Sequence, residues 1–211
     1  TSPRFIDLFI DEAKLVADLV HENIVQIYQL GQSDFGYYIV MEYVHGLSLA
    51  DFIHFHSVTD AKLPSELAVF ITSRVARGLA YAHSRFSPEG SPMNIVHRDV
   101  CPNNVLITTE GLPKLGDFGV AKAANNVFSS DDRSLIGKMM YMSPEQASRE
   151  SADHRADIYA LGMVLFELLS FKHARGPWEG DPLRAAREGS VDWDSLPDGI
   201  DPDLRHILGK M

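Results

Sequence analysis

One predicted hairpin constrains this chain more than any other feature, because polar residues stand at both of its ends. Its strands are Val105-Leu106-Ile107 and Pro113-Lys114-Leu115, which flank the turn residues Glu110-Gly111. The segment His97-Arg98-Asp99-Val100-Cys101-Pro102-Asn103-Asn104 leads into the hairpin, and Asp117-Phe118-Gly119 follows it. A carboxylate, a carboxamide and a second carboxylate are thereby arranged around a single hairpin.

Transfer of a phosphoryl group from a magnesium nucleotide requires this set of groups. One acid accepts the proton of the attacking hydroxyl, while an amide and a second acid hold the metal ions that neutralise charge on the phosphates. The order of the residues matches the pattern H-R-D-x-x-x-x-N … D-F-G. The chain therefore resembles the eukaryotic-like serine/threonine protein kinases.

The resemblance implies an α+β, protein-kinase-like fold in which the second lobe is mostly helical. The sequence pattern predicts helices at residues 8–20, 48–56 and 157–170, a helix that begins at Pro64 and Ser65, and a hairpin of strands 24–30 and 36–42. Residues 1–44 then form a partial first lobe (one helix, one hairpin and the hinge), and residues 45–211 form the second lobe. In the helix after Pro64, the expected buried stripe is Leu67, Ile71, Val75 and Leu79.

The charge balance limits the kinds of partner. The 211 residues include 19 basic and 29 acidic ones, and the net charge of −10 argues against nucleic acid or anionic lipid as the main partner. The longest apolar run, residues 158–166, is too short to be a membrane segment. Cys101 is the single cysteine, so no internal disulfide can form, as is usual in a reducing cytoplasm. We therefore expect a cytoplasmic location.

The resemblance assigns roles to the three polar side chains. Asp99 is the expected catalytic base, and Asn104 and Asp117 are the expected ligands of Mg²⁺, which prefers hard oxygen donors. The expected nucleotide is ATP. Taken alone, Asp99 is equally consistent with an Asp that caps a turn. The kinase interpretation is favoured because His97, Arg98 and Asn104 stand at the offsets of the family pattern.

The stretch Met41-Glu42-Tyr43-Val44 corresponds, by the same resemblance, to the gatekeeper and hinge. Met41 is the gatekeeper, and backbone groups of Glu42 and Val44 would bind the adenine. Leu106 would lie beneath the ring, and Ser48 would lie near the ribose. Taken alone, this stretch is also consistent with a strand that leaves an ordinary sheet.

Glu12 stands where the family has a glutamate that pairs with a lysine of an earlier strand. That lysine and the glycine-rich loop over the phosphates would precede Thr1, and the chain stops inside a helical pattern at Met211. The sequence thus reads as a kinase domain truncated at both ends, and we expect this chain alone to be inactive. A pseudokinase that docks partners is the first alternative, and a small-molecule phosphotransferase of the aminoglycoside-kinase type is the second.

Two positions depart from the family pattern. Cys101 stands two residues after Asp99, where these kinases usually have Lys, and Lys138 stands where they usually have Thr. The two positions face each other across the active site in the family. We therefore expect Lys138 to act as a catalytic residue that supplies the cation missing from the catalytic loop. The same combination resembles kinases of the myxobacterial type. A solvated surface lysine is the alternative.

Further contacts follow from the resemblance. Asp157 is expected to accept hydrogen bonds from the backbone of the catalytic loop, although a charge at the start of a helix is favourable in any fold. An apolar column is expected to contain Phe118, His97, Val16 and Ile27.

Regulation and substrate class are expected to follow the family as well. Arg98 is expected to bind a phosphate on the activation segment, where Ser129, Ser130 and Ser134 are the candidates. Pro102 and residues 141–145 favour Ser/Thr over Tyr acceptors. The expected partners are ATP and a protein substrate, and dimerisation and autophosphorylation are left open.

Overall fold

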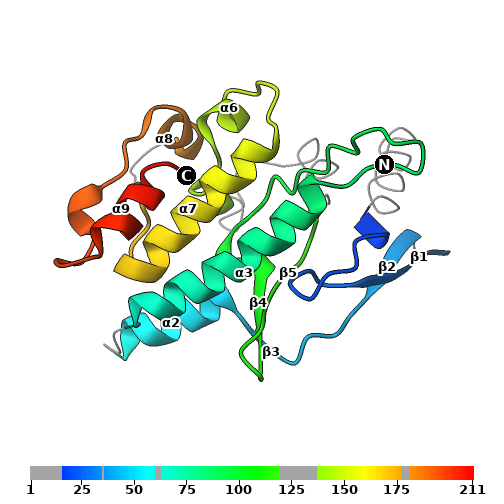
Figure 1. Ribbon diagram of the computed structural model, residues 1–211, viewed down its shortest axis with the longest axis horizontal. Helices are drawn as coiled ribbons and strands as arrows, with labels where there is room; N and C mark the ends of the chain where they lie inside the picture. Colours follow the sequence, from blue (N-terminus) through cyan, green and yellow to red (C-terminus); the bar gives the residue numbers. More distant parts are fainter. Residues whose placement is uncertain (1–15, 35, 60–62, 119–136, 177–180) are drawn as a thin grey trace.

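The computed structural model describes residues 16–34, 36–59, 63–118, 137–176 and 181–211 (Figure 1). Its strands are β1 (Ile27–Ser33), β2 (Gly36–Met41), β3 (Gly46–Ser48), β4 (Val105–Thr108) and β5 (Pro113–Leu115). Its helices are α2 (Leu49–Val58), α3 (Ser65–His83), α6 (Pro144–Ala147), α7 (His154–Ser170), α8 (Pro182–Glu188) and α9 (Pro202–Leu208), with 3₁₀ turns η1 (Pro102–Asn104) and η2 (Trp193–Ser195). The predicted helix at residues 8–20 lies mostly outside the described residues.

The first hairpin forms as predicted, but its turn is shorter. β1 and β2 pair antiparallel from Ile27 opposite Met41 to Ser33 opposite Gly36, with a register shift after Ile27. The predicted end of the first strand at residue 30 was wrong, because Gly31 lies within β1, opposite Tyr38. A Cβ at Gly31 would lie only 2.3 Å from the Tyr38 ring, so the glycine makes room for that ring inside the sheet.

Helices α3 and α7 pack against each other and form the centre of the core (Figure 1). The predicted stripe of α3 is wrong at one position, because Leu67 is exposed and Ala68 is buried in its place. The stripe continues through Ile71, Val75 and Leu79 as expected. Helix α7 buries residues on all sides, as predicted from its apolar sequence.

A second sheet positions the segment that carries the polar residues. Its strand order is β3-β4-β5, and β4 and β5 form the predicted hairpin. Residues 23–25 lie beside β5, because Leu115 N–H donates to the Asn23 carbonyl and Val25 N–H donates to the Leu115 carbonyl, both at 2.9 Å. Helix α3 comes close on the other side, where a Cβ at Gly78 would lie 3.0 Å from the Asn23 carbonyl oxygen.

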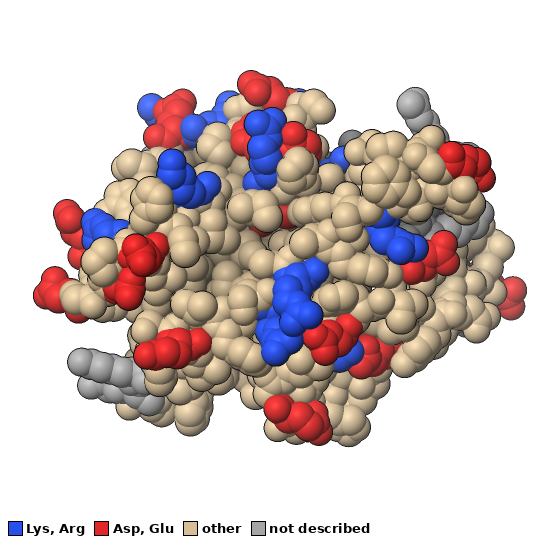
Figure 2. Space-filling view, in the orientation of Figure 1, with Lys and Arg blue, Asp and Glu red and all other residues tan. Residues whose placement is uncertain are grey.

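Charged side chains of both signs lie intermixed on the face shown in Figure 2. Within the described ranges, no helix combines the length and the apolar character that a membrane crossing requires.

Candidate active site

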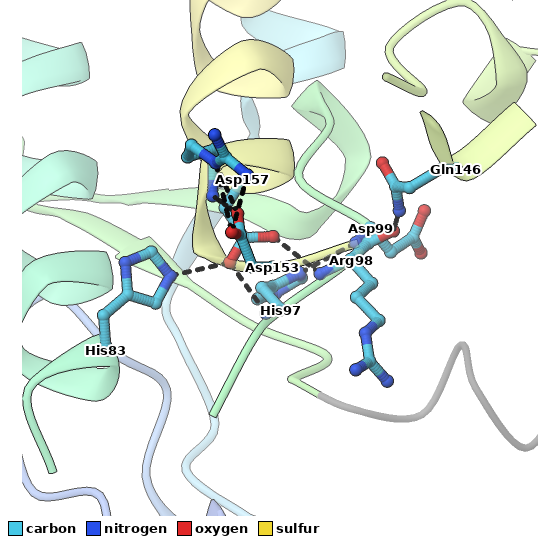
Figure 3. A network of polar contacts seen from close by, with 8 residues as sticks. His83, His97, Arg98, Asp99, Gln146, Asp153 and Asp157 are labelled. Atoms are coloured by element: carbon cyan, nitrogen blue, oxygen red, sulfur yellow. Dashed lines mark hydrogen bonds and ion pairs between the residues drawn. The ribbon is translucent and has the colours of Figure 1, made fainter. Parts of the chain in front are cut away.

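A buried carboxylate holds the backbone of the segment around Asp99. Asp157 on α7 is fully buried and accepts hydrogen bonds from the backbone N–H groups of His97 at 2.8 Å and Arg98 at 2.7 Å. The His83 Nε2 atom lies 2.8 Å from the same carboxylate (Figure 3). Asp153, not Asp157, is the N-cap of α7. The predicted contact with the loop is therefore present, and Asp157 also lies in the first turn of α7, where a negative charge is favourable in any fold.

His97 joins this loop to the segment after β5. Its Nε2 atom lies 2.8 Å from the Gly116 carbonyl oxygen, and its Nδ1 atom accepts the backbone N–H of Asp99 at 3.2 Å. A carbonyl acceptor on one side and an N–H donor on the other assign the proton to Nε2. The Phe118 ring is buried and meets the His97 ring edge to face, with 4.5 Å between the ring centroids. His97 thereby fixes the loop of Asp99 relative to the neighbours of Asp117.

Two donors converge on one oxygen of Asp99. The Asn104 side-chain amide donates to Asp99 Oδ2 at 2.9 Å and to the Asp99 carbonyl at 2.7 Å. The Lys138 ammonium donates to the same Oδ2 at 2.5 Å. The predicted contact between Lys138 and Asp99 is therefore present, and the alternative of a freely solvated Lys138 is not observed. Because the Asn104 nitrogen faces Asp99, its Oδ1 atom is left for another ligand.

The electrostatics of this pair follow from burial and charge. Burial opposes the charge on Lys138, but the hydrogen bond and the charge of Asp99 outweigh it, so the pKa of Lys138 lies above its usual value. Cys101 is buried, and desolvation followed by the charge of Asp99 raises the pKa of its thiol to about 12. The site thus contains a cation from the activation segment and a neutral thiol where the family usually has a lysine.

Asp117 is exposed at the end of β5 and has a left-handed backbone with φ of 56°. It lines a small hollow, together with Phe118, Val16, Val25, Ile27, Ile39 and Met41. Three members of the predicted column thus share one hollow, and His97 joins them through its ring contact with Phe118.

The donor set near Asp99 fits Mg²⁺ better than a transition metal. In the described part of the chain, no three His, Cys, Asp or Glu side chains are grouped as a metal site. Asn104 and Asp117 offer two hard oxygen donors, and Mg²⁺ is typically held by one or two protein groups together with phosphate oxygens and water.

In the predicted hinge, the Glu42 side chain has protein partners, whereas several backbone groups have none among the described residues. The Glu42 carboxylate pairs with the Lys114 ammonium at 2.9 Å and accepts the Gln26 backbone N–H at 3.2 Å. Burial alone would raise the pKa of Glu42. The hydrogen bonds from Lys114 and Gln26 and the charge of Lys114 together have a larger, opposite effect, so the pKa of Glu42 lies below its usual value. In the described segments, the carbonyl of Glu42 and both backbone polar groups of Val44 form no backbone hydrogen bond.

The other residues predicted to contact the nucleotide differ in their burial and in the hydrogen bonds that they already form. Leu106 is half-buried on β4, paired with Ser48 on β3. Ser48 caps α2, since its hydroxyl accepts the Asp51 N–H at 3.1 Å and donates to the Asp51 carboxylate at 2.6 Å. Met41 is 42% exposed. Glu12 and the three candidate phosphorylation serines, Ser129, Ser130 and Ser134, lie outside the described residues.

Two residues, Gln146 and Arg175, hold the backbone of residues 139–143 and were missed in the sequence analysis. The Gln146 side chain donates to the Arg98 carbonyl at 3.0 Å (Figure 3). It also accepts the Ser143 N–H at 3.2 Å. The capping-box spacing of Ser143 and Gln146 was a readable signal for it. Arg175 donates to carbonyls of residues 139–142, and no sequence motif marks it.

Comparison with known proteins identifies the family. The profile described as "Protein kinase domain" matches residues 3–185. The chain belongs to the protein kinase domain family. This agrees with the predicted fold, and it accounts for the arrangement of Asp99, Asn104 and Asp117 around one hairpin.

Several bacterial kinases are similar to this kinase domain. It is 41% identical to serine/threonine-protein kinase PrkC of Bacillus subtilis, over 98% of the chain and 31% of that protein. It is also 41% identical to tyrosine-protein kinase MasK of Myxococcus xanthus, over 80% of the chain and 26% of that protein. The chain thus spans about a quarter to a third of the length of these relatives.

A solved structure supports the same fold. A double mutant of the Mycobacterium tuberculosis PknI kinase domain matches with a TM-score of 0.64 and 27% identity, over 88% of this chain and 65% of that one.

Proposed function

We propose that this chain is the catalytic domain of a protein kinase that transfers the γ-phosphoryl group of ATP to Ser or Thr hydroxyls of a protein substrate. The observation that carries the proposal is the convergence of Asn104 and Lys138 on Asp99. A binding module without chemistry has no need for a buried amide and an ammonium on one carboxylate oxygen.

The hydrogen bonds of Asp99 support different roles for its two carboxylate oxygens. Oδ2 already accepts from Asn104 and Lys138, so Oδ1 is the atom that takes the proton of the substrate hydroxyl. The hydroxyl oxygen forms a bond to the γ-phosphorus as the bond from that phosphorus to the bridging oxygen breaks, and ADP leaves. The Lys138 ammonium stabilises the charge on the transferring group.

Asn104 Oδ1 and Asp117 would hold Mg²⁺, which when bound neutralises charge on the phosphates. The free backbone groups of Glu42 and Val44 would bind the adenine, with Leu106 beneath the ring, Met41 behind it and Ser48 near the ribose. Glu12 would pair with the phosphate-binding lysine of the family. The Ser48 hydroxyl already donates to the Asp51 carboxylate, so it would accept, rather than donate, a hydrogen bond from the ribose.

The acceptor class is the open part of the proposal. The names of PrkC and of PknB from Mycobacterium leprae, which is 35% identical, specify serine/threonine kinases, whereas the name of MasK specifies a tyrosine kinase. We favour Ser/Thr, because Pro102 and residues 141–145 match that class. Tyrosine transfer is the second candidate, and analysis of the phosphorylated amino acid distinguishes the two.

Transfer of labelled phosphate by the natural full-length protein tests the function. Wild type should label a Ser/Thr peptide in the presence of ATP and Mg²⁺. The Asp99→Asn variant should transfer phosphate at least about a hundredfold more slowly, because general-base catalysis typically contributes that much to the rate. Equal rates for both proteins would refute the base assignment. Binding of ATP without any transfer would favour the pseudokinase alternative.

We also propose a regulatory phosphorylation, on the basis of the resemblance to the family. Autophosphorylation at Ser129, Ser130 or Ser134 would supply a phosphate that Arg98 binds. We place the domain in the cytoplasm. Replacement of all three serines by Ala should then reduce transfer by the full-length protein, and unchanged activity would remove this part of the proposal. Mixing active and Asp99→Asn copies would show whether one copy phosphorylates another, as a dimer would allow.

A further inference from the structure

Arg175 is a buried cation in the loop after α7, with only 6% of its surface exposed. Its Nη1 atom donates to the carbonyls of Met140 at 2.8 Å and Met139 at 3.4 Å. Its Nη2 atom donates to the Met142 carbonyl at 2.8 Å, the Tyr159 hydroxyl at 2.9 Å and the Ala186 carbonyl at 3.1 Å. The guanidinium thus joins the backbone of residues 139–142 to α7 and α8.

The carbonyls that Arg175 binds belong to the turn that carries Lys138. Residues 137–142 form a helical turn, in which the N–H groups of Met140, Tyr141 and Met142 donate to the carbonyls three residues earlier. The Met140 and Met142 carbonyls accept no backbone hydrogen bond within this turn and lie at its negative end. Arg175 supplies the missing donors, as cations at helix C-termini do.

An arginine suits this position better than a lysine. Its planar fork presents several donors in fixed directions, so one side chain can define the orientation of successive carbonyls. Among the described residues, the ion pairs include no carboxylate partner for Arg175, and its Nε–H is buried without an acceptor. The guanidinium also lies over the Tyr159 ring, 5.6 Å from its centroid. Burial of a cation without a carboxylate partner has a desolvation cost, and the fixed directions of its donors indicate that Arg175 defines the geometry of the carbonyls that it contacts.

The turn transmits this geometry to Asp99. Met139, which Arg175 contacts, is the residue directly after Lys138, and the Tyr141 N–H donates to the Lys138 carbonyl at 3.1 Å. The Tyr141 hydroxyl donates to Glu167 on α7, so the turn is held through its backbone and through one side chain. The Lys138 ammonium then reaches Asp99 from a fixed platform.

We infer that Arg175 is a positioning residue that acts through Lys138, by capping the turn that aims its ammonium at Asp99. This inference rests on the proposed function. Loss of the cap frees the turn to rotate, and a displacement of about 1 Å at a catalytic group is enough to reduce a rate about a hundredfold.

A double-mutant cycle in the full-length protein tests the inference. The proteins are wild type, Arg175→Met, Lys138→Met and the double variant, and kcat, the KM for ATP and the melting temperature are measured for each. Arg175→Met alone should lower kcat by about tenfold or more, with little change in the KM for ATP. Added to Lys138→Met, it should lower kcat by less than about twofold, because a positioning effect vanishes once its target is gone.

Arg175→Lys and Arg184→Met serve as controls. Arg175→Lys keeps the charge and fewer hydrogen bonds, so it should recover part of the lost kcat. Arg184 is exposed on α8, and its ion pair among the described residues is with Glu188 at 2.9 Å, so its replacement should leave kcat unchanged. Equal fold losses in both backgrounds, or losses in Arg175→Met and Arg175→Lys that follow the fraction of folded protein, would overturn the inference. An inactive wild type would instead refute the proposed function.

Discussion

Replacing Asp157 by Asn should destabilise the domain strongly, because its fully buried carboxylate serves three partners. These are the backbone N–H groups of His97 and Arg98 and the ring of His83. A hydrogen bond to a charged group contributes about 1.5–3 kcal/mol. Asn keeps one acceptor oxygen, but its NH₂ group faces a donor, so at least one buried N–H loses its acceptor. We expect a loss of about 3 kcal/mol in the free energy of unfolding.

Urea unfolding followed by circular dichroism measures this effect. With a slope of about 3 kcal/mol per molar urea for a domain of this size, the midpoint should fall by about 1 M. Asp153→Asn is the matched control on the same helix, since Asn caps a helix N-terminus as well as Asp does and Asp153 is the exposed cap. A midpoint for Asp157→Asn that coincides with that of Asp153→Asn would refute the assignment of Asp157 as the anchor of the loop.

Three further predictions concern single side chains near the site. Lys138→Met should lower kcat by about a hundredfold with little change in KM. Since the pKa of Lys138 is raised, its stabilisation should be complete in neutral and mildly alkaline solution below the usual 10.5 and be lost as the pH rises through the higher folded value, which alkaline unfolding of wild type and variant would reveal. The hydrogen bond and then the charge of Glu167 raise the pKa of His173 against the effect of burial, so the stabilisation by this pair should decrease as the pH rises from the usual 6.5 through the higher folded value. The difference in melting temperature between wild type and His173→Gln should therefore shrink as the pH is raised above 6.5, and a constant difference would contradict this. Cys101, whose buried thiol has a pKa of about 12, should react with a disulfide reagent at pH 8 only after urea is added, and rapid labelling of the folded protein would be inconsistent with its burial.

Local patterns made much of the fold predictable. The β4–β5 hairpin and the buried α7 follow from turn residues and apolar periodicity, which depend on neighbouring residues alone. The phase of α3 was less certain, because residues 67–71 are a run of five apolar side chains. Several stripes fit such a run, and only the packing of α3 against α7 decides that Ala68 is buried while Leu67 is exposed.

The candidate site was predictable where it depends on residue identity. Lys138 could be recognised because two departures from one pattern compensate each other, and Gln146 could have been recognised by its spacing from Ser143. Arg175 could not be predicted, since its acceptors are mostly main-chain carbonyls that any residue offers. A contact of this kind leaves no trace in sequence, and only the folded backbone reveals it.

The pairing of residues 23–25 with β5 has a mechanical consequence. Leu115, which holds Asn23 and Val25 through its backbone, lies two residues before Asp117 on a continuous chain. A displacement of residues 23–25 therefore reaches Asp117 without passing through residues 41–44, which we assign to the gatekeeper and hinge. A shift of these buried residues can in this way move the Asp117 carboxylate, which we propose as a metal ligand, through main-chain hydrogen bonds alone.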